Sequence, residues 1–118
     1  MHYLLLIYGN EQNGAEMNEA AANAMKNEYR VFTESIAKSG HYKGGNALQP
    51  TKTATTVRMR DGKRQVTDGP FAETREQLGG YYLVDAKDLD EASDIASRIP
   101  GAKWGSIEIR PIWLMPTA

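Results

Sequence analysis

One carboxylate stands where the sequence could support acid–base chemistry. Asp68 directly precedes a glycine–proline corner, Gly69-Pro70, and the aromatic residue Phe71 follows it. Pro70 has a fixed φ angle and favours an extended backbone at Gly69. A carboxylate on such a rigid corner could act as a general base, or hold a polar ligand or a metal ion. Alternatively, Asp68 accepts hydrogen bonds from the backbone amides of its own turn, as aspartate commonly does.

Further charged side chains flank this corner. One turn of helix after it would place Glu73 beside Glu76 or Gln77, and paired carboxylates can transfer protons or bind a hard cation. A solvated, charged turn explains the same residues. Arg58 and Arg60 alternate with apolar residues along the preceding segment. They could bind an anionic ligand, or they could pair with acidic side chains on a neighbouring strand.

The composition excludes several other chemistries. The chain has no cysteine, so it has no disulfide, thiolate metal site or cysteine nucleophile. Its two histidines, His2 and His41, are far apart and lack a third ligand at a useful spacing, so we predict no metal site. Neither a Gly-x-Ser-x-Gly elbow nor a phosphate-binding glycine loop is present, and we expect no cofactor.

Length and charge describe an ordinary globular chain. It has 118 residues, 41% hydrophobic and 25% charged, with a net charge of −1. This length predicts one domain over residues 1–118. The balanced charge argues against a nucleic-acid partner, and no stretch has the amphipathic or polybasic pattern of a membrane-binding segment. We recognise no targeting signal, so the expected location is the cytoplasm.

The first half of the chain predicts a strand and a long helix. Tyr3–Tyr8 is an unbroken apolar run, which is typical of a central strand. The polar segment 10–18 is predicted to be a loop. Apolar residues then recur at helical spacing between Asn18, a helix cap, and Ser39, with Gly40 as the stop signal.

The middle of the chain predicts strands. His41–Pro50 is glycine-rich and reads as half strand and half loop, and an Asp61-Gly62 turn joins Ala54–Arg60 to Lys63–Asp68 in a hairpin. Gly79–Ala86 is the next strand. Its opening Gly79-Gly80 pair indicates a β-bulge, a close backbone contact or a ligand lying on the backbone.

The last part of the chain predicts a second helix and a final strand. Asp88 caps the helix, Pro100 ends it, and Gly105–Trp113 alternates as a strand does. The element order predicts an α+β, ferredoxin-like βαββαβ fold with an added hairpin. Helices on one face of such a sheet leave the other face uncovered, and a second copy of the chain is the simplest cover. Tyr81, Tyr82, Trp104 and Trp113 are predicted to lie in the core or at that interface rather than in a binding stack.

Several stretches together resemble one known family. The segment TDGPFAETREQLGGYYLVDAKDLDEA is similar to the signature of the DGPF-domain proteins, a branch of the YCII-related family. YLLLIYGNE, GGNALQPTKTATTVRMRDGKRQVTDGPF and GSIEIRPIW fit the same family in the same order. The resemblance therefore covers nearly the whole chain.

The resemblance implies a fold rather than a reaction. Relatives are ferredoxin-like proteins that pair into a dimeric α/β barrel, with a cleft near the interface. YCII-like relatives carry a histidine on the first helix and an aspartate near the cleft, and Tyr29 stands at the histidine position here. An unperturbed tyrosine titrates near pH 10, so it is a poor base at neutral pH but a good hydrogen-bond donor. Members of the DGPF branch are often encoded beside sigma factors, which implies a regulatory context.

These observations predict a homodimer in which each copy has a cleft lined by five residues: Tyr29, Arg58, Asp68, Phe71 and Tyr82. Two functions fit the cleft. The first is a small-molecule-binding or regulatory accessory protein without chemistry of its own. The second is a cofactor-independent enzyme in which Asp68 is the acid or base, acting on a small polar or aromatic substrate.

Overall fold

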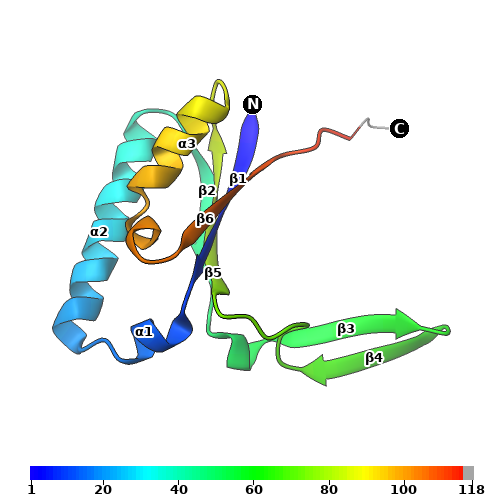
Figure 1. Ribbon diagram of the computed structural model, residues 1–118. Coiled ribbons are helices and arrows are strands. Elements are labelled where there is room, and N and C mark those ends of the chain that lie inside the picture. Colours follow the sequence, from blue (N-terminus) through cyan, green and yellow to red (C-terminus); the bar gives the residue numbers. More distant parts are fainter. Residues whose placement is uncertain (116–118) are drawn as a thin grey trace.

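Four strands form one antiparallel sheet, and two more form a separate hairpin that projects from it (Figure 1). The computed structural model describes residues 1–115; residues 116–118, the end of the predicted domain, lie outside the described residues. The elements in chain order are β1 (His2–Gly9), α1 (Glu11–Ala15), α2 (Glu19–Lys38), β2 (Tyr42–Ala47), η1 (Thr51–Thr53), β3 (Thr55–Arg60), β4 (Lys63–Asp68), β5 (Gln77–Asp85), α3 (Leu89–Arg98), η2 (Pro100–Lys103) and β6 (Ser106–Pro111).

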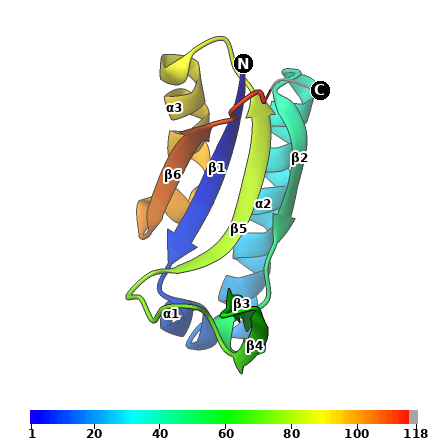
Figure 2. The same ribbon diagram turned by 90° about the vertical axis from the view of Figure 1, so that its right-hand side faces the viewer.

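The sheet has the ferredoxin-like order that the sequence predicts, β2-β5-β1-β6. β1 lies in the middle and pairs with β5 on one side and β6 on the other, as its continuous apolar sequence indicates. Both long helices cover one face of the sheet, and Figure 2 shows the opposite face with no layer in front of it. The α+β fold is therefore confirmed, with the hairpin β3–β4 inserted between β2 and β5.

The long helix begins and ends where its capping residues predict. The Asn18 side chain accepts a hydrogen bond from the Ala21 amide at 2.8 Å, and Gly40 adopts a φ of +83° just beyond the last turn. Phe32 and Ile36 on this helix are buried against Val84 and the other apolar residues of the sheet. The tightly packed core therefore lies under the C-terminal half of α2.

Segment 10–18 differs from the predicted loop, because it contains the short helix α1. Asn10 caps this helix by accepting a hydrogen bond from the Gln12 amide at 2.9 Å. The predicted turn of helix at Glu73 does not form, and that segment is irregular. Apolar periodicity gave no signal for α1, because none of its residues is buried.

The hairpin β3–β4 forms an arm that projects from the body. Asp61 and Gly62 both have positive φ angles, 52° and 73°, as a tight hairpin turn requires. The arm leaves the body on the side of the uncovered sheet face (Figures 1 and 2). It accounts for the large radius of gyration, 16.4 Å, against about 13.5 Å for a compact domain of this length. No helix in the described part of the chain is long and apolar enough to cross a membrane.

Three side chains join the C-terminal end of α2 to the first turn of α3. The Nε2 atom of His41 lies 3.0 Å from a carboxylate oxygen of Glu91, and its Nδ1 atom lies 2.6 Å from the Ser39 hydroxyl. A carboxylate can only accept, so His41 donates from Nε2. The same Glu91 oxygen accepts a hydrogen bond from the Lys87 amide at 3.1 Å. This contact, followed by the histidine, lowers the pKa of Glu91.

We predict that Glu91→Gln lowers the melting temperature at pH 7. Because the pKa of Glu91 is lowered by folding, its contribution is present above the ordinary glutamate pKa and lost as the pH falls through the lowered value. The difference from wild type should therefore disappear in acid, as measured by circular dichroism melts. Glu34→Gln, which breaks the exposed Arg30–Glu34 pair, is the control and should have little effect. Equal melting temperatures at pH 7 for wild type and Glu91→Gln would contradict this assignment.

Candidate functional site: a tyrosine-lined pocket

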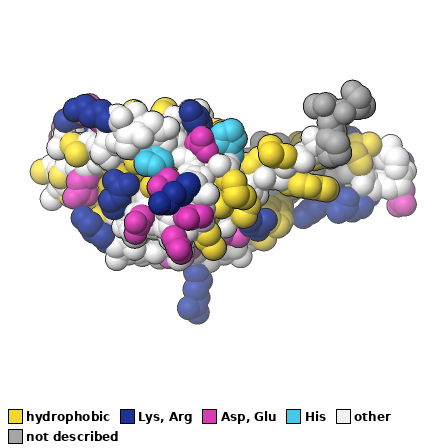
Figure 3. Space-filling model, turned by 90° about the horizontal axis from the view of Figure 1, so that it is seen from above, with side chains coloured by type: hydrophobic (Ala, Val, Ile, Leu, Met, Phe, Trp, Pro, Cys, Tyr) yellow, Lys and Arg dark blue, Asp and Glu magenta, His cyan; other side chains and the backbone are white. Residues whose placement is uncertain are grey.

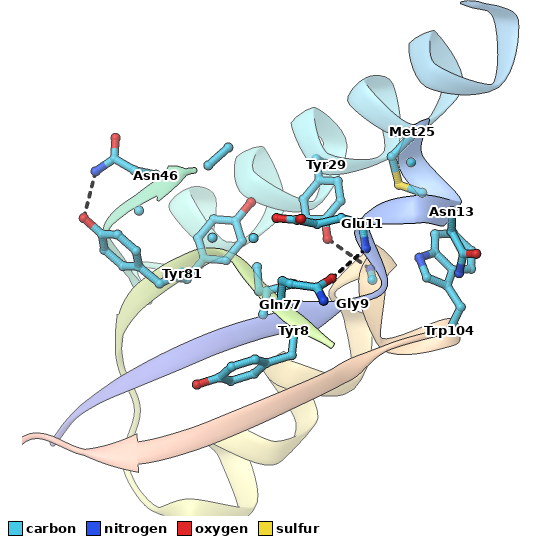
Figure 4. Close-up of a pocket in the computed structure, with 18 of the residues that line it drawn as sticks. Tyr8, Gly9, Glu11, Asn13, Met25, Tyr29, Asn46, Gln77, Tyr81 and Trp104 are labelled. Carbon is cyan, nitrogen blue, oxygen red and sulfur yellow. Dashed lines mark hydrogen bonds between the residues drawn. The ribbon is translucent and has the colours of Figure 1, made fainter. Parts of the chain in front are cut away.

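A pocket of about 530 Å³ lies between the N-terminal half of α2 and the adjacent end of the sheet. This volume is within the range of small-molecule sites. α1 and the turn η2 also contribute to its wall. Figure 4 shows Tyr81 and Asn46 at one end, and Met25, Asn13 and Trp104 at the other.

Tyrosines from several elements contribute to this pocket. Five of the six tyrosines line it, together with Trp104 and two methionines. Tyr29, Tyr42 and Tyr82 lie on the helix side of the sheet, whereas Tyr8 and Tyr81 contribute from strand positions whose side chains alternate to the opposite face. Tyrosine combines an apolar ring with a polar tip, so the pocket offers flat apolar surfaces and several hydroxyl groups.

Tyr29 is held by the backbone of η2. Its hydroxyl oxygen accepts a hydrogen bond from the Gly101 amide at 3.1 Å. A Cβ atom at Gly101 would lie 2.7 Å from that oxygen, so only glycine permits this close approach. Burial raises the pKa of Tyr29, against the effect of the Gly101 hydrogen bond. Tyr29 therefore keeps its proton at neutral pH.

Tyr82 belongs to a chain of hydrogen bonds that ends on α2. The Thr33 hydroxyl lies 2.8 Å from the carbonyl oxygen of Tyr29 and 2.7 Å from the Tyr82 hydroxyl. Thr33 has one proton and donates it to the carbonyl, so Tyr82 must be the donor to Thr33. Burial raises the pKa of Tyr82 as well, which keeps that donor protonated.

Glycines allow close packing in the sheet wall of the pocket. A Cβ atom at Gly45 would lie 2.9 Å from the Tyr82 ring, and one at Gly80 would lie 3.0 Å from the Asn46 carbonyl oxygen. The register of β1 and β5 shifts beside Gly79, which confirms the predicted bulge. At Gly79 a Cβ would meet only one atom within 4 Å, the Ile7 carbonyl oxygen at 3.9 Å.

Glu11 is the one charged residue in the pocket lining, and its carboxylate is already engaged. One oxygen accepts from the Thr51 amide at 2.7 Å and the other from the Thr51 hydroxyl at 2.8 Å. The Glu11 amide donates in turn to the Gln77 side chain at 2.9 Å. These bonds attach α1 to Thr51, which precedes the arm, and to Gln77, which follows it. Figure 4 shows the bond to Gln77.

The structure separates the five residues predicted to share a cleft. Tyr29 and Tyr82 line the pocket. Arg58, Asp68 and Phe71 lie on the arm or just after it, outside the pocket lining. Arg58 contacts the Phe71 carbonyl oxygen at 3.5 Å, and the Phe71 side chain is 78% exposed.

The corner after Asp68 is held by hydrogen bonds of Gly69 with Ala54 and Thr56 rather than by the aspartate side chain. The Gly69 amide donates to the Ala54 carbonyl at 2.7 Å, and Thr56 donates to the Gly69 carbonyl at 2.8 Å. Within residues 1–115 the Asp68 carboxylate makes no hydrogen bond, so the expected bonds to amides of its own turn are absent. Gly69 has a φ of +98°, which favours glycine, instead of the expected extended backbone.

The sequence analysis did not place three residues of the pocket lining: Tyr8, Tyr42 and Trp104. Tyr8 ended a strand-like run, and Tyr42 lay in a segment read as half loop. Trp104 was assigned to the core or interface but is half exposed beside the pocket. Within residues 1–115 no three acidic or histidine side chains are placed to hold a metal ion.

The sheet order and the helices on one face define a ferredoxin-like protein with a pocket between helix and sheet. The chain belongs to the YCII-related family, because the model of the YCII-related domain matches residues 1–116. It is also 35% identical over 116 residues to an uncharacterized protein of Rhizobium meliloti (strain 1021), covering 97% of this chain and 94% of that protein.

We predict that two tyrosines ionise late in an alkaline titration. Because folding raises the pKa of Tyr29 and Tyr82, their contribution to stability is present below the ordinary pKa near 10 and lost as the pH rises through the raised values. Tyrosinate absorbance should show a late phase close to alkaline unfolding. Tyr29→Phe and Tyr82→Phe should each remove part of that phase. A single transition near pH 10 for all six tyrosines would contradict the prediction.

Proposed function

We propose that this protein is a small-molecule-binding accessory protein that takes its ligand into the tyrosine-lined pocket and performs no chemistry there. The observation that carries the proposal is one cavity of about 530 Å³ between helix and sheet, with Tyr29, Tyr42 and Tyr82 in its wall. The lining contains no histidine, lysine or arginine, and its one carboxylate, Glu11, is already engaged. Such a lining suits binding better than proton transfer. The proposed place of action is the cytoplasm, which suits a chain without cysteine.

A thermal-shift screen with uncharged small molecules tests this function. A compound that binds only the folded chain raises its melting temperature. We expect Gly79→Leu to abolish that shift, because a side chain at this open lining position fills part of the pocket. Asp68→Asn should keep it, because Asp68 lies outside the lining. If Gly79→Leu retained the full shift, the pocket would not be the site.

The same variants separate binding from catalysis. Each stabilising compound is incubated with the protein and followed by mass spectrometry. The accessory role predicts that wild type leaves every compound unchanged. Turnover by wild type that Asp68→Asn abolishes would instead establish the enzyme hypothesis, with Asp68 as its acid or base.

We further propose that the protein acts as a homodimer in which two uncovered sheet faces meet. Leu4 and Leu6 alternate with the buried Tyr3 and Leu5, so they lie on the face opposite the helices. Leu6 is paired across the sheet with Tyr81. This face is therefore apolar at its centre, and a second copy would remove it from water.

The arm supports this assembly in two ways. Four strands of six to nine residues make a face of roughly 400 to 600 Å², less than the about 800 Å² that each partner of a stable complex usually buries. The arm projects on the same side and exposes more apolar surface at Val57, Met59 and Val66. In Figure 3, hydrophobic side chains also gather on the flank of the body that faces the arm.

Charge fits the same arrangement. Residues 55–68 carry four basic and two acidic side chains, a net charge of +2. The whole chain has a net charge of −1, so the rest of it carries −3. An arm that reached across to a second copy would bring opposite charges together.

We predict a mass of about twice 13.1 kDa by light scattering at micromolar concentration. Leu6→Glu should yield a folded monomer, because it places a charge at the centre of the apolar face. Val31→Glu is the matched control: Val31 is an exposed apolar residue on α2, in the helix layer, and its substitution should leave the dimer intact. A monomeric wild type would refute the proposal.

A further inference from the structure

We infer that the pocket selects an uncharged aromatic compound that accepts a hydrogen bond from Tyr29 and donates one to Tyr82. This inference rests on the proposed function, because it names the class of ligand for the same pocket. It follows from three features of the lining: its charge, the direction of its hydrogen bonds and its ring surfaces.

The lining offers a charged ligand no free counter-charge. Glu11 is its one charged residue, and Thr51 already donates to both oxygens of that carboxylate. An anion entering the pocket would meet this negative charge and no cation. A cation would have to compete with the bonds that hold the arm to α1. Transfer of an unpaired charge from water into such a site is strongly unfavourable.

The two central phenols have opposite hydrogen-bonding capacity. The Tyr29 oxygen accepts from the Gly101 amide, and within residues 1–115 its own proton has no acceptor. Tyr82 donates its proton to Thr33, because Thr33 donates its own to the Tyr29 carbonyl. Tyr82 therefore has lone pairs, and Tyr29 a proton, with which to contact a ligand. A neutral amide, or another group with an acceptor beside a donor, matches both.

The surfaces of the pocket favour a flat ligand. Tyrosine rings and the Trp104 indole supply faces and edges for aromatic contacts. On the sheet side, Gly79 and Gly80 present backbone without side chains, so a planar ring can approach closely. Met17 and Met25 add flexible apolar contacts that adapt to the outline of the ligand.

Three naphthalene probes of nearly equal size test the inferred class. 2-Naphthamide is neutral, 2-naphthoate is anionic and 2-naphthylmethylammonium is cationic at pH 7. Each is titrated into the full chain and followed by amide and side-chain chemical shifts in NMR spectra. We expect 2-naphthamide to bind at least tenfold more tightly than either charged probe and to shift resonances of the pocket residues.

Tyrosine variants test the hydrogen bonds. Tyr29→Phe and Tyr82→Phe should each weaken 2-naphthamide binding about fivefold, with a smaller effect on the charged probes. Tyr3→Phe is the matched control, because Tyr3 is the one tyrosine outside the pocket lining, and it should bind as wild type does. Melting curves establish that each variant is folded. The ranking of the three probes uses wild type alone and does not depend on the variants.

Two failures can be told apart. If a charged probe binds as tightly as 2-naphthamide, or if Tyr29→Phe and Tyr82→Phe bind the amide as wild type does, the inferred ligand class is wrong and the pocket remains a binding site. If none of the three probes shifts a pocket resonance, the proposed function fails and this inference fails with it.

Discussion

The size of the side chains between α2 and the sheet decides which part of the interior is solid and which is hollow. Under the C-terminal half of the helix, Phe32 and Ile36 meet Tyr82 and Val84, and the space is filled. Under the N-terminal half the sheet presents glycine, and no side chain closes the gap. Apolar side chains gain contacts when they fill such a space. A cavity therefore persists only where the opposite backbone carries no side chain that can fill it.

Two glycines, Gly45 and Gly101, also determine where two tyrosines lie around that cavity. Gly45 permits the Tyr82 ring to lie against β2, and Gly101 permits the Tyr29 hydroxyl to reach the backbone of η2. Tyr29 and Tyr82 each make one hydrogen bond within the protein. Tyr29 therefore keeps its proton, and Tyr82 its lone pairs, for a hydrogen bond to a ligand. The pocket is therefore organised before anything enters it, which lowers the entropic cost of binding.

The arm is a different kind of structure from the body. A two-stranded hairpin is marginally stable alone in water, yet β3 and β4 project from the sheet with their apolar residues exposed. Glu11 and Thr51 attach the base of the arm beside the pocket. The glycine–proline corner ends the arm, and the segment after it returns the chain to β5. Asp68 therefore lies outside the pocket lining, although Gln77, at the start of β5, belongs to it.

Local signals in the sequence determined the elements. Asn18 and Asp88 cap their helices, Asp61-Gly62 turns the hairpin, and Gly79 marks a bulge, because each of these features depends on residues within a few positions of one another. Only the tertiary structure decided the site. Tyr29, Tyr42 and Tyr82 come from three separate elements, and their meeting at one cavity depends on long-range strand pairing and on side chains that are absent opposite them. Asp68 was the conspicuous residue by type and spacing, but the direction in which a hairpin leaves a sheet is set by tertiary contacts at its base, which no local pattern records.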